Sequence, residues 1–261
     1  MKEQSKVHWF LVWQLVKVAL TIQFKKSFIG ITWLFLAPIL AIIAWVLLHG
    51  AGVINPGDTG IPYPAYVLLS MSLWGFFSDA YTGTSHILLN NSRILLTTST
   101  SSNVLMLEAI IVHLIRFSIP MLLNVFVLIA FDVDLHWLGL LFPIALLPLL
   151  LLSAGAGLIV GLFRVVAIDL ANIIDHGVRF LMFLTPIIYA PKLEIPWIGT
   201  IVNYNPLTYL IGMPRDMLTN GSMELLPGFM MSTLLSGVFF SVAYVIFTRS
   251  EKKILERLIN N

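Results

Sequence analysis

The stretch HWLGLLFPIALLPLLLLSAGAGLIVGLFRVV, residues 136–166, decides the fold of this chain. Arg164 is its single charged residue. A helix that crosses the hydrocarbon core of a bilayer needs about 20 predominantly apolar residues. A run of this length and composition therefore predicts a helix that lipid surrounds.

The composition of the whole chain agrees with that interpretation. Of 261 residues, 58% are hydrophobic and 11% are charged, whereas soluble domains average about 45–50% apolar and about 25% charged residues. A soluble domain needs charged surface on all sides, but lipid tolerates continuous apolar surface. The net charge of +2 and the absence of cysteine argue against a nucleic-acid partner, disulfides, thiolate metal sites and thiol nucleophiles.

Six segments are long and apolar enough to cross a membrane as helices: residues 28–51, 62–89, 104–131, 136–166, 170–190 and 226–248. We therefore predict an all-α membrane protein with six transmembrane helices, organised as a single transmembrane domain. Within it, residues 1–27 form a cytoplasmic tail and interfacial helix, 28–190 hold spans one to five, 191–225 form an external re-entrant segment, 226–248 form span six, and 249–261 form a second cytoplasmic tail.

The segment 191–225 is apolar in places, but Pro196, Pro206 and Pro214 interrupt it. Because proline breaks helices, the apolar stretches are too short to cross. We expect this segment to dip into the membrane from outside and return. Irregular backbone at membrane depth is tolerated where protein or a water-filled cavity shields it from lipid.

Charge placement sets the predicted orientation. Lysine and arginine concentrate before the first span and after the last, and such residues mark the cytoplasmic side. Both termini are therefore predicted to be cytoplasmic, which a seventh crossing would prevent.

Residues 5–24, with Trp9 and Trp13 four residues apart, are typical of an amphipathic helix lying in the membrane interface. An additional, poorly bounded span is the alternative.

The chain has no Gly-x-x-x-x-Gly-Lys-Ser/Thr loop, no His-Glu-x-x-His and no Gly-x-Ser-x-Gly, so the common nucleotide, zinc and hydrolase motifs are missing. Ionisable residues within the predicted spans are the usual pointers to function in a membrane protein. Here they are Asp79, Glu108, His113, Arg116, Asp175 and Arg179.

These ionisable residues allow more than one role. Asp175 and Arg179 are four residues apart in the fifth span, and this spacing predicts a structural ion pair on one helix face. His113 and Arg116 can share a face of the third span. For them, substrate contact, packing between helices and contact with a wet cavity are the alternatives. Asp79 in the second span also needs a polar or charged partner, and the sequence does not identify that residue.

Five stretches, in order, carry a resemblance to a known family: FKKSFIGITWLFLAPIL (24–40), PYPAYVLLSMSLWGFF (62–77), LLNNSRILL (88–96), DLANIIDHGVRFLMFLTPIIY (169–189) and NYNPLTYLIGMPRDML (203–218). Together they resemble the membrane subunit of ABC-2 type exporters, in the branch that exports O-antigen, capsular polysaccharide and teichoic acid. The matching positions are Gly30, Trp33, Pro38, Tyr63, Tyr66, Trp74, Phe76, Phe77, Asp169, Pro186, Tyr189, Asn205, Pro206 and Arg215.

The chain departs from this family in two places. The family usually has Arg-Asp before the fifth span, whereas Ile168 precedes Asp169 here and the nearest arginine is Arg164. Many relatives have a basic residue and Phe-Pro after the third stretch, where this chain has the polar run TTSTSSN (97–103).

The resemblance implies a homodimer that works with two copies of a separate cytoplasmic ATPase. ATP and Mg would be bound by that partner, so this chain would hold no cofactor and would be a transport subunit rather than an enzyme. The cargo would be a lipid-linked glycan carried across the cytoplasmic (inner) membrane. The third stretch would dock on the ATPase through Asn90, Asn91, Ser92, Arg93, Ile94, Leu95 and Leu96; an ordinary short loop is the alternative.

Three other functions are possible for a membrane protein of this composition. An ABC-2 exporter of a drug or small lipid is the nearest alternative. An ion-coupled secondary transporter is disfavoured, because no discontinuous helices recur in the two halves and no buried carboxylate cluster occurs. A membrane enzyme acting on lipid-linked sugar would need paired carboxylates or a metal site, and neither is evident.

Overall fold

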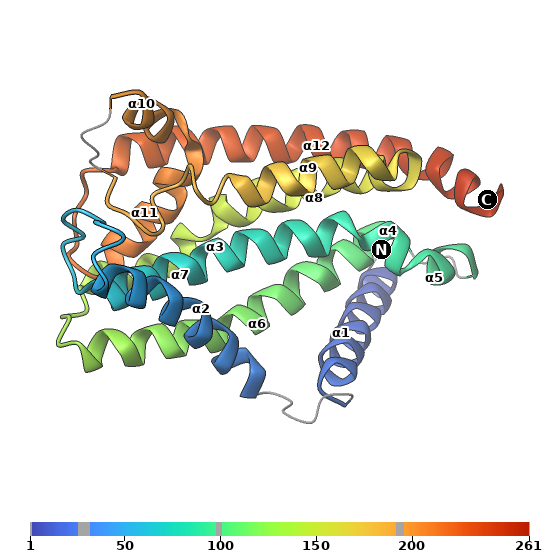
Figure 1. Ribbon diagram of the computed structural model, residues 1–261. Helices are drawn as coiled ribbons and strands as arrows, with labels where there is room; N and C mark the ends of the chain where they lie inside the picture. Colours follow the sequence, from blue (N-terminus) through green and yellow to red (C-terminus); the bar gives the residue numbers. More distant parts are fainter. Residues whose placement is uncertain (1, 26–31, 98–100, 192–195, 261) are drawn as a thin grey trace.

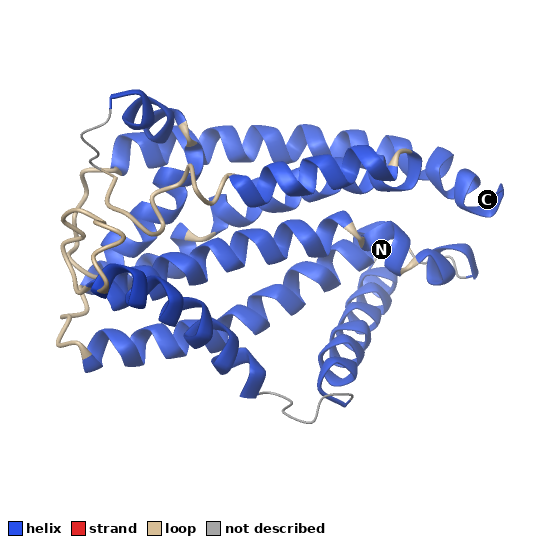
Figure 2. Ribbon diagram, viewed as in Figure 1, coloured by secondary structure: helices blue, strands red, loops and turns tan. Residues whose placement is uncertain are grey.

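The computed structural model describes residues 2–25, 32–97, 101–191 and 196–260, and within these ranges the chain is helical and has no strand (Figures 1 and 2). The elements in chain order are α1 (Lys2–Lys25), α2 (Trp33–Gly50), α3 (Tyr63–Ser85), α4 (Ile87–Asn90), α5 (Ser92–Thr97), α6 (Ser102–Ala130), the 3₁₀ helix η2 (Trp137–Leu141), α7 (Phe142–Ala145), α8 (Leu147–Val166), α9 (Ile168–Phe180), α10 (Pro196–Tyr204), α11 (Pro206–Leu218) and α12 (Leu226–Asn260).

Three helical runs in the described part of the chain are long and apolar enough to cross a membrane, judged by length and composition. They are α6, the run Trp137–Val166 formed by η2, α7 and α8, and the Leu226–Ser250 part of α12. Helices α2 and α3 have 18 and 23 residues, which at 1.5 Å per residue gives lengths of about 27 and 34 Å. The all-helical prediction is therefore confirmed, and the predicted segments 104–131, 136–166 and 226–248 correspond to these three runs.

The long helices lie side by side, with α8 at the centre (Figure 1). Helix α8 packs against α3, α9 and α12, and α6 packs against α3. The connections after α2, α6 and α11 gather at one end of the molecule, while α4, α5 and the α8–α9 turn lie at the other (Figure 1). At the first of these ends, two backbone hydrogen bonds connect the segments to one another. Ala190 N–H donates to the Pro56 carbonyl over 2.7 Å, and His136 N–H donates to the Leu218 carbonyl over 3.1 Å.

Helix α1 runs at a steep angle to the others (Figure 1). It contacts α6 through Val12 and Val16, both 1% exposed, which pack against Val104 and Val112. Trp9 and Trp13 are more than half exposed and lie next to this buried face rather than opposite to it. Tryptophan is typical of the membrane interface, and the interfacial position of α1 stays a prediction.

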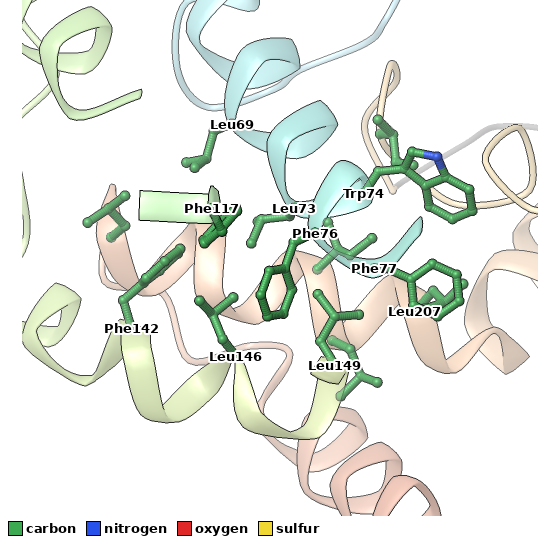
Figure 3. Close-up of a cluster of buried hydrophobic side chains, with 14 of the residues drawn as sticks. Leu69, Leu73, Trp74, Phe76, Phe77, Phe117, Phe142, Leu146, Leu149 and Leu207 are labelled. Atoms are coloured by element: carbon green, nitrogen blue, oxygen red, sulfur yellow. The ribbon is translucent and has the colours of Figure 1, made fainter. Parts of the chain in front are cut away.

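The largest buried cluster joins α3, α6, α8 and α11 (Figure 3). Phe76 and Phe117 lie at its centre, with their ring centroids 4.7 Å apart. The family-matching Trp74 and Phe77 belong to the same cluster. Lipid tails are as apolar as these side chains, so within a membrane this cluster stabilises the fold through close packing more than through removal from water.

Two glycines bring the backbones of α3 and α8 into direct contact. A methyl group on Gly157 would overlap the Thr84 hydroxyl and lie 2.5 Å from the Tyr81 carbonyl oxygen. One turn later, a methyl on Gly161 would lie 3.1 Å from the Ser85 carbonyl oxygen. Small residues four apart are a common means of close helix packing in membranes.

The structure corrects two details of the predicted helices. The fifth predicted helix, residues 170–190, ends at Phe180 and is followed by turns up to residue 191. Pro186 has no N–H to donate, so a helix through this position would lack one hydrogen bond. Pro214 does not interrupt its segment, because it lies inside α11; Pro196 and Pro206 begin α10 and α11, the position where proline is best tolerated.

Candidate functional site

Seven polar or proline residues from three distant segments of the chain meet at one end of the bundle. They come from the start of α3, from the turns that follow α9, and from α11. We call this group the motif cluster, because its members lie in the stretches that carry the family resemblance: Tyr63, Tyr66, Thr185, Pro186, Tyr189, Asn205 and Arg215.

Arg215 is the centre of the motif cluster and is 4% exposed. Its Nη1 donates to the Ser70 hydroxyl over 3.2 Å and to the Pro186 carbonyl over 3.4 Å. Its Nε donates to Asp216 Oδ1 over 3.2 Å, and its Cζ lies 4.3 Å from the centroid of the Tyr66 ring. A planar guanidinium can serve all these neighbours at once, which a lysine ammonium cannot.

Two tyrosines of α3 hold the turns that follow α9. The Tyr66 hydroxyl lies 3.1 Å from the Pro186 carbonyl oxygen and 2.8 Å from that of Tyr189. The Tyr63 hydroxyl donates to the Ile188 carbonyl over 3.1 Å. Carbonyls in an irregular segment have no helical partner, and buried ones need a donor from elsewhere. The tyrosines supply it, so the non-helical segment is fixed against α3.

Asn205 fixes the same turns to α11. Its side-chain oxygen accepts from Leu207 N–H over 3.0 Å and caps the helix, as asparagine commonly does. Its side-chain nitrogen donates to the Leu184 carbonyl over 3.1 Å and to the Thr185 hydroxyl over 2.9 Å. Pro206 then begins α11. The polar groups of the motif cluster are thus engaged within the protein, so the cluster acts as a brace.

A second polar network lies between α3, α8 and α9. Arg164, which is 6% exposed, donates to both carboxylate oxygens of Asp175 over 2.9 Å. Tyr81 donates to Asp175 over 2.6 Å, and Arg164 also lies 3.3 Å from the Ser85 hydroxyl. Ser85 in turn lies 3.1 Å from the ring of His86, which directly precedes α4.

This network corrects the predicted Asp175–Arg179 pair. The partner of Asp175 is Arg164 on the neighbouring helix, and Arg179 lies exposed on α9. Asp169, the other acid of α9, is exposed in its first turn. Arg164, the arginine nearest to Asp169 in the sequence, therefore pairs with a different acid of α9. That acid, Asp175, lies about two turns beyond Asp169.

The remaining ionisable residues of the predicted spans come together from α3 and α6. Asp79 interacts electrostatically with His113 and Arg116, and Arg116 also interacts with Glu108. Asp79 is exposed, and the other three are partly buried. The sequence placed His113 and Arg116 on one face, which the structure shows. It named no partner for Asp79, because that partner is on another helix, 34 residues along the chain in the case of His113.

The predicted ATPase-coupling segment folds as two short helices, α4 and α5, separated at Asn91. Arg93 is exposed, whereas Leu95 is 8% exposed and packs in a cluster that contains Phe247 of α12 and Leu105 of α6. The segment therefore has a face that is free in this chain and a face that is anchored to the bundle. Leu95 belongs to the anchored face.

Three further positions that carry the family resemblance lie near the start of the chain. Gly30 lies outside the described residues, and Trp33 and Pro38 fall in α2. In the described part of the chain, no three His, Asp or Glu side chains are grouped in a way that could hold a metal ion.

Comparison with known proteins gives the chain a set of named relatives. No protein-family model matches it. An O-antigen export system permease protein RfbA from Klebsiella pneumoniae is 21% identical over 235 residues, which cover 86% of this chain and 89% of the relative. A second protein of that name and organism is 21% identical and covers 78% of each chain. One from Myxococcus xanthus is 24% identical and covers 69% of this chain and 68% of the relative. These matches confirm the resemblance to O-antigen export permeases.

Proposed function

We propose that this chain is the membrane permease subunit of an ATP-driven ABC exporter that moves a lipid-linked polysaccharide across the cytoplasmic membrane. The observation that carries the proposal is the similarity to permeases named for O-antigen export, which extends over most of both chains. O-antigen is the cargo that these relatives are named for, and a polysaccharide of the capsule or teichoic acid type belongs to the same proposal. The long apolar helices provide the membrane domain that such a subunit needs.

The proposed topology has six crossings with both termini in the cytoplasm. The crossings are α2, α3, α6, the run from η2 to α8, α9 with the turns after it, and α12. Helices α10 and α11, with 9 and 13 residues, are about 14 and 20 Å long and so shorter than a hydrocarbon core of about 30 Å. In this arrangement they form the re-entrant segment at the external mouth, and the motif cluster braces that mouth.

The proposed assembly is a homodimer of this chain with two copies of a cytoplasmic ATPase. A two-fold arrangement lets two small bundles enclose a path that one bundle is too small to provide. Helices α4 and α5 lie at the end of the bundle opposite the motif cluster (Figure 1) and present the exposed Arg93, which suits docking to a separate subunit. Movement there would reach α9 through His86, Ser85, Arg164 and Asp175.

Deletion and complementation in the native host test this function. We expect deletion of the chain to remove polysaccharide from the cell surface, to accumulate the lipid-linked glycan inside, and to be reversed by a plasmid copy. A tagged copy should co-purify with an ABC ATPase. Surface polysaccharide that persists after deletion would contradict the proposal, and loss of efflux of a drug or small lipid instead would favour the alternative cargo.

A further inference from the structure

Helix α3 has an uncovered face made of small and polar residues. Most of α3 is buried, and its uncovered positions recur at the three- and four-residue spacing that defines one face of a helix. We call this face the α3 stripe: Gly75, Ser78, Asp79, Thr82 and Gly83. Among the large hydrophobic side chains that the described residues expose, none belongs to α3.

Two other long helices, α6 and α12, expose the opposite kind of surface. The uncovered side of α6 carries Leu114, Leu122 and Phe126, and that of α12 carries Leu234 and Val238, all at least 41% exposed. Such surfaces suit contact with lipid tails. The α3 stripe does not, because a carboxylate in hydrocarbon costs several kcal/mol and intramembrane charges almost always face a bundle interior or a wet cavity.

The α3 stripe continues onto α6 through basic side chains with unused hydrogen-bonding atoms. His113 lies over Gly83, where an added methyl would be 3.7 Å from its Nε2. That Nε2 atom and Nε of Arg116 are buried and have no hydrogen-bond partner among the residues that the structure describes. Both side chains interact electrostatically with Asp79. Unpaired buried polar atoms are rare in folded proteins and call for an explanation.

We infer that Asp79, His113 and Arg116, together with the α3 stripe, form a binding site for the sugar residues of the exported glycan, an inference that rests on the proposed function. Hydroxyl groups donate and accept hydrogen bonds, so a sugar can donate to the Asp79 carboxylate while it accepts from Arg116. Gly75 carries no side chain, and nothing lies within 4 Å of where its Cβ would be, which leaves space for a ring next to the backbone.

The charge balance of this site favours a hydroxyl-rich ligand over an anion. Asp79 and Glu108 bring two carboxylates to the single guanidinium of Arg116. A phosphate group would meet repulsion from both acids, whereas sugar hydroxyls would meet acceptors and a donor.

A second copy of the chain is also a poor occupant, because a two-fold interface on this face would place the acidic side chains of the two copies near one another.

The first test compares export by substituted chains in the native host, with the ATPase present. For Asp79→Asn and Arg116→Gln we expect surface polysaccharide to fall about tenfold, as after loss of one charge-assisted hydrogen bond. The amount of protein in the membrane, the co-purification of the ATPase and its ATP hydrolysis without cargo should stay unchanged. Asp134→Asn is the matched control, since Asp134 is an exposed acid in the connection after α6.

The second test detects contact directly and does not depend on how the substituted chains fold. A photo-crosslinking amino acid at Thr82, exposed on the α3 stripe, should capture the glycan in cells that export it, and one at Phe126 should not. An adduct that an antibody to the polysaccharide recognises supports the site. Capture of membrane lipid alone, of a second copy of the chain, or of nothing would overturn it.

The two proposals fail in distinguishable ways. If deletion of the whole chain leaves surface polysaccharide intact, the proposed function is wrong. If deletion abolishes it but Asp79→Asn and Arg116→Gln export normally and Thr82 captures no glycan, only the sugar-binding site is wrong.

Discussion

At the scale of single residues, the buried charges of this protein differ in how fully the chain engages them. Arg215 and Arg164 each have several partners within the chain, although Nε of Arg164 has no hydrogen-bond partner among the described residues. The described residues provide no hydrogen-bond partner for the buried Nε2 of His113 and Nε of Arg116 either. We expect Arg215 and Arg164 to stabilise the fold of the membrane domain. We expect His113 and Arg116 to take part in its interaction with cargo.

Replacement of Arg215 tests the bracing role. Lysine keeps the charge but cannot donate to Ser70, Pro186 and Asp216 together, so Arg215→Lys should destabilise the protein by about 3–5 kcal/mol, the range for a broken buried charge network. For a chain of this size that corresponds to a melting temperature lower by about 6–20 °C. The measurement is thermal unfolding of detergent-purified protein.

The exposed Arg179 provides the control for this comparison, and Arg179→Lys should change the melting temperature by less than about 2 °C, as expected of a surface substitution. Equal melting temperatures for the Arg215 and Arg179 variants would show that the motif cluster does not brace the fold.

At the scale of elements, α4 and α5 join the bundle to the end where we place the ATPase. Arg93→Ala removes an exposed charge, so it should impair export and ATPase co-purification while protein levels stay normal. Leu95→Ala empties part of a buried cluster and should lower the melting temperature, with a cost of about 2–5 kcal/mol typical of such a truncation. A stable Leu95 variant, or an Arg93 variant that exports at the wild-type rate, would contradict this division of roles.

Much of the fold could be predicted from hydropathy and proline placement, because long apolar runs and helix-breaking residues act locally. Residues 136–166 and 226–248 were recognised in this way. The pairing of Asp175 could not be predicted, since Arg164 is on another helix and Arg179, at the favourable four-residue spacing, was the only partner visible locally. Likewise, the polar face of α3 could not be told from a buried face before its neighbours were known.

The residues of the candidate sites could also be predicted from the sequence only in part. The family motifs include Tyr66, Asn205 and Arg215, but only the folded chain shows that all three hold the turns that follow α9. A signal for the α3 stripe did exist in the sequence, as Gly75, Ser78, Asp79 and Thr82 recur on one helix face. It was obscured by the aromatic residues between them, which made the whole segment read as an ordinary span.

At the scale of the whole molecule, the six-crossing topology predicts on which side of the membrane each connection lies. A reporter fused at Asn220, between α11 and α12, should read as external, and one fused at Lys253 as cytoplasmic. A fusion at Asp132 provides an external control, because the connection after α6 lies at the same end of the bundle as Asn220 (Figure 1). A cytoplasmic reading at Asn220 would overturn both the re-entrant segment and the number of crossings.

The close fit between Gly157 and the backbone of α3 limits which parts of the molecule can move during a transport cycle. Two helices whose main chains touch cannot slide or rotate past each other without a collision. Helices α3 and α8 are therefore expected to move together as one rigid pair. Any rocking that opens a passage is then expected between this pair and the helices packed against it, such as α2 and α9.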